Sequence, residues 1–170
     1  MKLLALVLAV SGIATAADQK FLSAPLQPAA DRKPAADFTL KNASNETVKL
    51  QDYRGKVVLL DFWATWCTGC KQEIPWFSEF QARYGPQGFA VVGVSLDEGG
   101  WKVLKPFLIE HKIPYQMVLG DESTAKGYGI ESMPDTFLID QQGLIAAAYI
   151  SGLVNRENIE TNIKALLANR

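Results

Sequence analysis

Both cysteines of this 170-residue chain lie in one stretch, Trp66-Cys67-Thr68-Gly69-Cys70, with two residues between them. Two thiols at this spacing can form a disulfide and exchange it with a disulfide of another molecule, through attack by a thiolate. A purely structural disulfide is a poor alternative, because a bridge across two residues closes a very small loop and removes little entropy from the unfolded chain. A domain of this size also buries enough core to fold without it. The pair therefore predicts redox chemistry.

The segments on either side of the cysteines place them where a thiolate is stabilised. Residues 56–63 form an apolar run typical of a strand buried on both faces, and residues 68–84 carry apolar side chains at helical spacing. A cysteine at the start of that helix faces unpaired backbone N–H groups and the positive end of the helix dipole. We therefore expect Cys67 to be the exposed nucleophile and Cys70, one turn further along, to be the resolving thiol.

A C-x-x-C pair is also half of a typical zinc site, but zinc needs about four ligands and an iron–sulfur cluster needs more cysteines. The remaining ligand of suitable chemistry is the single histidine, His111, which lies far along the sequence on a predicted helix. We expect it at a surface or helix end, and we expect no metal site. The alternative function is an exported module that binds or delivers copper, because two thiolates suit Cu(I), with His111 or Met133 as a third ligand.

Asp61 is a charged residue inside the apolar strand that leads to the cysteines. Burial without a partner would raise its pKa, and a carboxyl of raised pKa beneath the disulfide could move the proton of Cys70. The alternative is a strand-end aspartate that reaches solvent or a backbone donor.

The N-terminus predicts export. Lys2 precedes an apolar stretch, and Ala14-Thr15-Ala16 fits the small-residue cleavage pattern of a signal peptide. We expect a signal peptide over residues 1–17 rather than an uncleaved anchor, because the uncharged stretch is shorter than the ~20 residues that span a bilayer. The mature protein is then periplasmic or otherwise extracytoplasmic, where disulfides persist.

The rest of the chain predicts one domain after a linker. Residues 18–35 contain three prolines and no periodicity, which favours an extended linker. The domain spans residues 36–170, and its nearly balanced charge, 17 basic against 18 acidic residues, gives no basic stripe for nucleic acid. The expected strands are 38–40, 47–50, 56–63, 89–96, 115–119, 136–140 and 144–150; the expected helices are 68–84, 98–111 (interrupted by Pro106), 122–128 and, capped by Asn155, 156–169.

Three segments carry a resemblance to a known family. Residues 56–75, KVVLLDFWATWCTGCKQEIP, resemble the active-site segment of the thioredoxin superfamily and, more narrowly, of the exported TlpA/ResA-like thiol:disulfide oxidoreductases. Residues 133–140, MPDTFLID, resemble the second motif of that family, in which a cis-proline faces the cysteines. Residues 98–119 resemble its inserted helix–strand unit. The resemblance implies an α/β, thioredoxin-like three-layer fold: a central mixed sheet flanked by helices, with an N-terminal β-hairpin.

The resemblance also implies roles for single residues. Pro134 would be cis and would expose the backbone of Met133 for pairing with a substrate segment, and Trp66 would lie beside the thiols at the rim. Asp61 would exchange protons with the resolving cysteine. Glu73 would handle protons or face the substrate, and its alternative is an ordinary solvated helix residue.

The function that follows is an extracytoplasmic thiol:disulfide oxidoreductase that reduces protein disulfides, with cytochrome c maturation as one suggested role. No cofactor is expected beyond the Cys67–Cys70 couple, and without an NADPH or flavin motif a membrane thiol donor would re-reduce it. We expect a monomer. Thr68-Gly69 departs from the commoner proline-containing pairs, so no redox potential is assigned. A peroxidase on a related fold is disfavoured, because no Pro and Thr peroxide-binding pattern precedes Cys67.

Overall fold

The computed structural model describes residues 21–169, so the expected signal peptide lies outside the described residues. Within this range the chain forms one mixed sheet in the order β1-β8-β7-β4-β5-β6-β2-β3, in which β4 and β6 run parallel to β5. The strands are β1 (Lys33–Pro34), β2 (Thr39–Asn42), β3 (Thr47–Lys49), β4 (Val57–Trp63), β5 (Phe89–Ser95), β6 (Gln116–Leu119), β7 (Asp135–Ile139) and β8 (Leu144–Tyr149).

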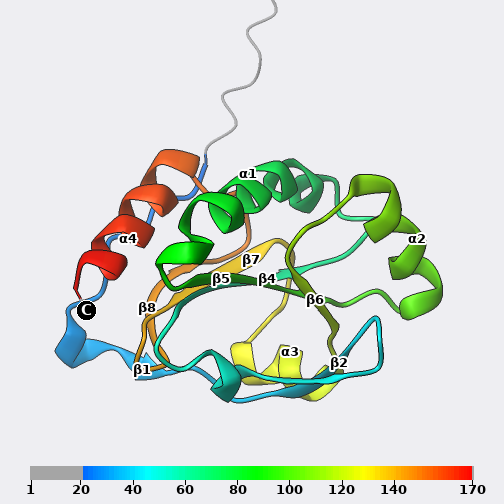
Figure 1. Ribbon diagram of the computed structural model, residues 1–170, viewed down its shortest axis with the longest axis horizontal. Helices are drawn as coiled ribbons and strands as arrows, with labels where there is room; N and C mark the ends of the chain where they lie inside the picture. Colours follow the sequence, from blue (N-terminus) through cyan, green and yellow to red (C-terminus); the bar gives the residue numbers. More distant parts are fainter. Residues whose placement is uncertain (1–20, 170) are drawn as a thin grey trace, which may run out of the picture.

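Helices cover both faces of this sheet. Helices α1, α2 and α4 lie on one face and α3 lies on the other (Figure 1). Their bounds are α1 (Thr68–Tyr84), α2 (Trp101–His111), α3 (Glu122–Tyr128) and α4 (Arg156–Ala168), with short 3-10 helices at η1 (Ala29–Asp31), η2 (Leu50–Tyr53) and η3 (Gly85–Gln87). The arrangement confirms the three-layer α/β fold, the hairpin of β2 and β3, and the inserted α2–β6 unit.

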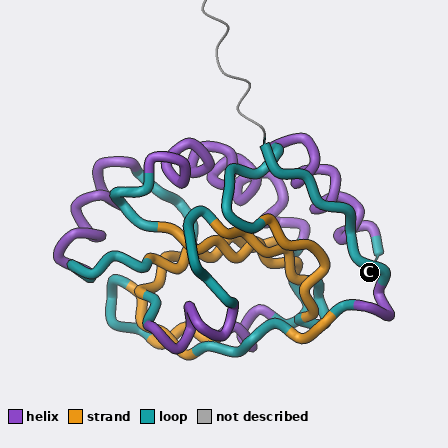
Figure 2. Tube along the Cα trace, turned by 180° about the vertical axis from the view of Figure 1, so that it is seen from behind, coloured by secondary structure: helices purple, strands orange, loops and turns teal. Residues whose placement is uncertain are grey.

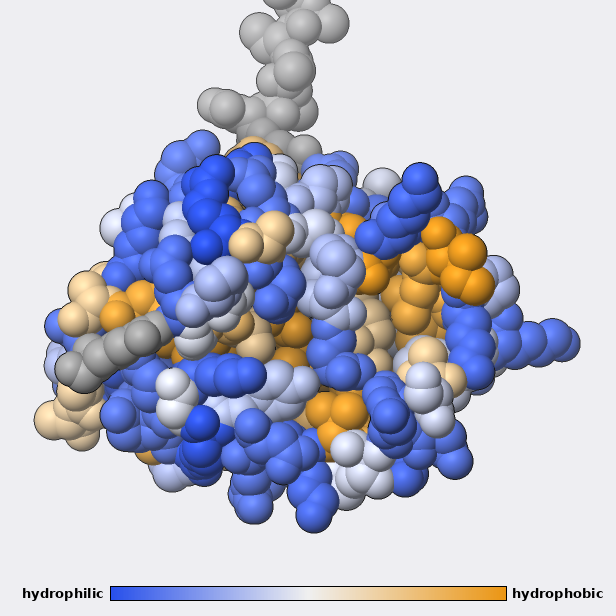
Figure 3. Space-filling view, viewed as in Figure 1, coloured by the Kyte–Doolittle hydropathy of each residue, from blue (hydrophilic) through white to orange (hydrophobic). Residues whose placement is uncertain are grey.

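Two apolar cores lie on the two faces of the central strands. Every residue of β4 and β5 is buried, as their continuous apolar sequences predicted. Alternate side chains go to opposite faces, so Leu59 and Trp63 pack under α1 whereas Leu60 and Phe62 pack toward α3. No helix among residues 21–169 has the length and apolar character needed to cross a membrane. Figure 3 shows a largely hydrophilic face, with apolar side chains toward the side where α2 lies.

Helix α2 differs from its expected form in two ways. It begins at Trp101 rather than at residue 98, because residues 97–100 form a turn in which the Gly100 N–H donates to the Asp97 carbonyl at 2.9 Å. Gly100 caps the helix with a positive φ of 57°. Pro106 does not interrupt the helix, and the prediction that it would is wrong. Pro106 is exposed, so water can satisfy the helix carbonyl that it leaves without a donor.

Residues 21–35 differ from the expected linker because they pack on the domain. The backbone of Leu22 pairs with the segment between β8 and α4, and the Gln27 N–H donates to the Ala146 carbonyl at 2.8 Å. Arg32 forms an ion pair with the buried Asp140 at 2.9 Å. Figure 2 shows this stretch as mainly loop, passing beside α4 on its way to β1. The segment is interrupted by the 3-10 helix η1, and the ordered unit begins before Ala36.

Candidate active site

The two cysteines form a disulfide at the N-terminus of α1, with 5.3 Å between their Cα atoms. Cys67 is the N-cap residue, and its sulfur accepts a hydrogen bond from the Cys70 N–H at 3.1 Å. Cys67 is 7% exposed, so the expectation that it is exposed is wrong for this disulfide-bonded form, and Cys70 is 0% exposed. The two sulfurs therefore differ: one lies nearer the surface and faces a backbone donor, and the other lies behind it in the core.

The turn that leads into Cys67 is held by Asp97, a residue that the sequence analysis missed. The buried Asp97 carboxylate accepts hydrogen bonds from the Thr65 N–H at 3.0 Å and from the Thr65 hydroxyl at 2.6 Å. Ser95, at the end of β5, donates to it at 2.8 Å. The parallel pairing of β4 and β5 brings their carboxyl ends together, which is the signal that could have placed Asp97 beside the cysteine turn. Trp66, which lies between Thr65 and Cys67, is 66% exposed.

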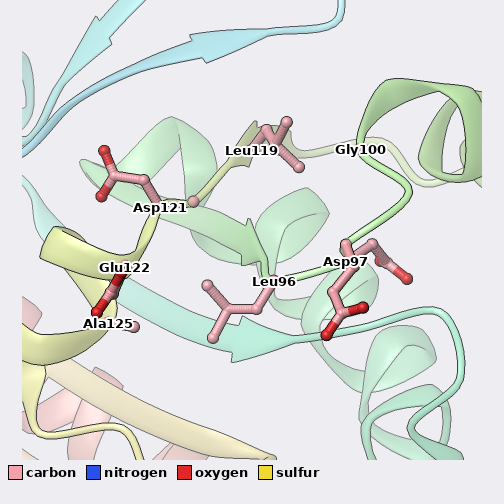
Figure 4. A pocket seen from close by; sticks show the side chains of 9 residues that line it. Leu96, Asp97, Gly100, Leu119, Asp121, Glu122 and Ala125 are labelled. Atoms are coloured by element: carbon pink, nitrogen blue, oxygen red, sulfur yellow. The ribbon is translucent and has the colours of Figure 1, made fainter.

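A cavity of about 420 Å³ lies beside this turn, between the ends of β5 and β6 and the start of α3. Figure 4 shows Leu96 and Leu119 between the carboxylates of Asp97 on one side and of Asp121 and Glu122 on the other. No cysteine lines this cavity, so the sulfur chemistry lies outside it.

Pro134 lies against the dipeptide between the cysteines. The Met133–Pro134 peptide bond is cis, which is the form that the resemblance implies. A Cβ atom built on Gly69 would be 3.5 Å from Pro134 Cδ. Pro134 also accepts a hydrogen bond from the Gly152 N–H at 3.3 Å. The fold therefore brings together β7 and the start of α1, whose sequences are more than sixty residues apart.

The loop between β8 and α4, residues 150–155, forms another wall of the site, and the sequence analysis did not anticipate it. A Cβ atom built on Gly69 would be 3.2 Å from Leu153 Cδ2, so the loop covers Gly69, one of the two residues between the cysteines. The Ser151 N–H donates to Asp135, and the Val154 N–H donates to Glu73 Oε1 at 2.7 Å. Asn155 caps α4 as predicted, accepting from the Asn158 N–H at 2.8 Å.

Asp61 and Glu73 are both buried, so the solvent-exposed alternatives for these two residues are wrong. Burial raises the pKa of Asp61 to about 7; the Thr136 hydroxyl, which donates at 3.2 Å, opposes the rise, and the charge of Asp135 adds to it. Burial also raises the pKa of Glu73 to about 9, with a further increase from the charge of Asp61 and a decrease from the Val154 N–H. Both groups can therefore hold a proton near neutral pH.

Tyr115, just before β6, is a third buried titratable group in this region, and the sequence analysis did not single it out. Its hydroxyl has no hydrogen-bond partner among the described residues. Burial, together with the charges of Asp61 and Glu73, raises the pKa of Tyr115 well above its usual value. Tyr115 packs in the same apolar core as both cysteines. The site thus combines a disulfide near the surface with a buried cluster of proton-holding groups.

His111 is the last residue of α2 and is exposed, with its ring 4.0 Å from that of Phe107. Within residues 21–169, no group of three or more His, Cys, Asp or Glu side chains is placed to hold a metal ion. The copper-binding alternative therefore gains no support from the described part of the chain.

Comparison with known proteins gives consistent results. The AhpC/TSA family matches residues 32–148. Thioredoxin-like protein YneN of Bacillus subtilis (strain 168) is 34% identical over 125 residues, which are 72% of this chain and 73% of the relative. Thiol-disulfide oxidoreductase ResA of Geobacillus thermodenitrificans (strain NG80-2) is 32% identical over 133 residues, covering 78% and 75% of the two chains.

A solved structure agrees as well. The crystal structure of a putative thiol:disulfide interchange protein DsbE from Chlorobium tepidum superposes with a TM-score of 0.73 at 33% sequence identity. The match covers 87% of this chain and 99% of that one. The likeness therefore includes the sheet, the helices and the segment that carries the two cysteines.

Proposed function

The chain belongs to the AhpC/TSA family and is a thiol–disulfide oxidoreductase of the ResA type, and we propose that it reduces disulfides of other proteins outside the cytoplasm. The observation that carries this proposal is the asymmetry of the disulfide. Cys67 lies at the N-terminus of α1 with a backbone donor on its sulfur, whereas Cys70 is fully buried, one helical turn before the buried Glu73. One sulfur is suited to meet a substrate, and the other is suited to release it.

The reaction is an exchange of one disulfide for another. The Cys67 thiolate attacks one sulfur of the substrate disulfide, forming a mixed disulfide and releasing the second substrate sulfur as a thiolate. The Cys70 thiolate then attacks the Cys67 sulfur, which restores the intramolecular disulfide and releases the first substrate sulfur. The substrate gains two electrons and the Cys67–Cys70 pair loses two. The backbone N–H groups at the start of α1 stabilise the Cys67 thiolate before it attacks.

The buried carboxyl groups supply the proton chemistry of this exchange. Cys70 has no exposed surface, so water cannot readily remove its proton. We assign that step to Asp61 and Glu73, with Glu73 one turn along α1 from Cys70. A general base works best when its pKa lies near the working pH, and the pKa of Asp61, raised to about 7, meets that condition.

Trp66 and the Met133 backbone are the groups that we assign to substrate contact. Trp66 precedes the nucleophile and exposes 66% of its surface. Met133 is partly buried and precedes the proline that lies against Gly69. An extended segment of the substrate, lying along Met133, would bring its disulfide to Cys67.

The location and the electron source complete the proposal. The N-terminal sequence supports export, and a membrane thiol donor would return electrons to the pair after each turnover. A role in cytochrome c maturation is the specific form that the family resemblance suggests. The similarity to the thiol-disulfide oxidoreductase ResA supports disulfide exchange as the chemistry.

The test is reduction of insulin disulfides by the protein in the presence of dithiothreitol. We expect Cys67→Ser to abolish catalysis, and we expect Cys70→Ser to accumulate a mixed disulfide that mass spectrometry detects without reducing agent. The double variant Cys67→Ser/Cys70→Ser is the matched control and should form no adduct. Normal turnover by Cys70→Ser would show that the two sulfurs are assigned in the wrong order. A wild-type protein that reduces no protein disulfide would contradict the function itself.

A further inference from the structure

The carboxyl group of Glu73 receives one hydrogen bond from the described residues. The donor is the Val154 N–H, 2.7 Å from Glu73 Oε1, and the second oxygen, Oε2, has no partner in this part of the chain. Both residues are fully buried. The position of one backbone N–H in the β8–α4 loop therefore decides how the Glu73 charge is stabilised.

Leu22 holds that N–H in place from the other side. The Leu22 N–H donates to the Leu153 carbonyl at 2.7 Å, and the Asn155 N–H donates to the Leu22 carbonyl at 2.7 Å. These two bonds form a parallel bridge between Leu22 and Val154. Successive N–H groups of an extended segment point in opposite directions, so the residue between the two bonds directs its own N–H away from Leu22 and toward Glu73.

The N-terminal arm, defined here as residues 21–24, is itself firmly attached. The Ala24 N–H donates to Asn158 Oδ1 at 3.0 Å, and Asn162 Nδ2 donates to the Ala24 carbonyl at 2.9 Å. Both asparagines belong to α4. The Leu22 side chain lies over Gly152: a Cβ atom built on Gly152 would be 3.3 Å from Leu22 Cδ1. The arm therefore joins α4 to the loop that reaches the active site.

We propose that Leu22 is a positioning residue for the thiol chemistry: by pairing with residues 153–155, it aims the Val154 N–H at Glu73 and fixes that carboxyl behind Cys70. This inference rests on the proposed function, because it gives the N-terminal arm a part in the proton transfer assigned to Glu73. It goes beyond that function by making a segment outside the cysteine and proline motifs part of the site.

The charges around Glu73 determine what release of the arm would do. Asp61 from β4 and Tyr115 from the residue before β6 face the same buried region, Cys70 lies one turn back on α1, and Asp135 of β7 acts on Asp61. Burial and the charge of Asp61 raise the pKa of Glu73, and the Val154 N–H lowers it. Loss of that donor would keep Glu73 protonated to a higher pH.

The test compares two proline variants, each of which removes one backbone donor of the N-terminal region. Leu22→Pro removes the N–H that bonds Leu153, and Gln27→Pro removes the N–H that bonds Ala146. The pH titration of the Glu73 carboxyl carbon is followed by NMR in the oxidised protein. We expect the midpoint to rise by about one pH unit in Leu22→Pro, the effect of losing one hydrogen bond to a charged group, and to stay unchanged in Gln27→Pro.

Insulin reduction provides the second measurement. We expect the pH dependence of the rate to move upward in Leu22→Pro, and we expect Leu22→Pro to cause no further change in a Glu73→Gln background. If Leu22→Pro does not fold, Leu22→Gly replaces it; this variant keeps the N–H but loses the packing on Gly152, and it should shift the midpoint in the same direction.

A Glu73 titration midpoint that is unchanged or lower in Leu22→Pro would overturn the inference. So would an equally large shift in the pH dependence of insulin reduction when Leu22→Pro is made in the Glu73→Gln background. The NMR titration requires no substrate. A wild-type protein that fails to reduce insulin would therefore contradict the proposed function, while the titration would still decide the role of Leu22.

Discussion

Asp61 and Glu73 are carboxyl groups in the core with no basic partner among the described residues. An ionised carboxylate loses its hydration on burial, so such groups are rare unless paired. Here Asp61 accepts one hydrogen bond from the Thr136 hydroxyl, and Glu73 accepts one from the Val154 N–H. Their raised pKa values allow them to accept and return a proton, and the same feature makes the folded state sensitive to pH.

Asp61→Asn should stabilise the protein at alkaline pH. The pKa of Asp61 is raised from 3.8 to about 7 on folding, so the folded state binds the proton more tightly, and stability falls as pH rises through that window. Asparagine does not ionise, and we expect the variant to raise the free energy of unfolding at pH 8 by on the order of 2 kcal/mol. The gain should fade as the pH falls toward 4. Urea unfolding at several pH values measures it.

Asp140→Asn is the matched control for that experiment. Asp140 is equally buried but accepts hydrogen bonds from Arg32 at 2.9 Å and from the Leu144 N–H at 2.9 Å. Its replacement should lower the free energy of unfolding at pH 7 by roughly 1 kcal/mol or more. If Asp61→Asn were destabilising at pH 8 as well, the argument from unpaired burial would fail.

The residues around the disulfide were predictable to different degrees. The cysteines could be identified from their spacing alone, and the cis form of Pro134 followed only from the family resemblance. The environment of Asp61 was left open, because the same apolar strand is compatible with a buried or a strand-end carboxylate. Asp97 and Tyr115 were missed, since their positions depend on contacts between segments that are distant in the sequence.

At the scale of elements, the helices and strands were predictable where their patterns were strong. The bounds of α1 and α3 agree with the sequence analysis, because apolar periodicity and glycine or proline boundaries coincide there. Helix α2 was the exception. Residues 98–100 precede the helix directly but contain two glycines, and the turn that they form is favoured over another helical turn.

Pro106→Ala should stabilise α2. Proline at this interior position cannot donate to the carbonyl of Lys102, and its side chain is exposed, so alanine adds a backbone hydrogen bond without altering the core. The gain is partly offset because proline restricts the unfolded chain. We expect a net increase of about 1 kcal/mol in the free energy of unfolding. Thermal and urea unfolding measure this difference.

Lys105→Ala is the control for the helix experiment, because it changes an exposed neighbour that keeps its N–H. It should leave the free energy of unfolding within about 0.5 kcal/mol of the wild-type value. An unchanged or lower stability for Pro106→Ala would show that the helix already compensates for the missing donor.

At the scale of the whole molecule, the proline-rich segment shows where reasoning from sequence reaches its limit. Prolines restrict the local backbone, so extended stretches in this segment were predictable, whereas the 3-10 helix η1 was not. Whether an extended segment docks depends on free backbone groups elsewhere, and those of β8 and of residues 153–155 pair with it. Proline content alone carries no information about these partners.

Export should remove the N-terminus just before the arm. The small-residue pattern at Ala14-Thr15-Ala16 predicts cleavage after Ala16 or Ala17, so the processed chain begins at Ala17 or Asp18. Expression of the entire chain in an export-competent bacterium, followed by intact mass measurement of the extracytoplasmic fraction, tests this.

The double variant Ala14→Leu/Ala16→Leu is the control for processing, since large residues at these positions should block cleavage. It should be recovered at its unprocessed mass in the membrane fraction. Recovery of the wild-type chain at its unprocessed mass would instead favour the uncleaved anchor.

The attachment of Leu22 affects how the protein can be shortened for laboratory use. A trimmed version that starts at Ala36 would retain both sulfurs, the cis-proline and seven of the eight strands. Its thiol exchange would nevertheless be slower at neutral pH, because Leu22 would no longer hold the Val154 N–H in hydrogen-bonding position on the Glu73 carboxyl group. Rates measured on such a minimal domain would understate the reactivity of the intact enzyme.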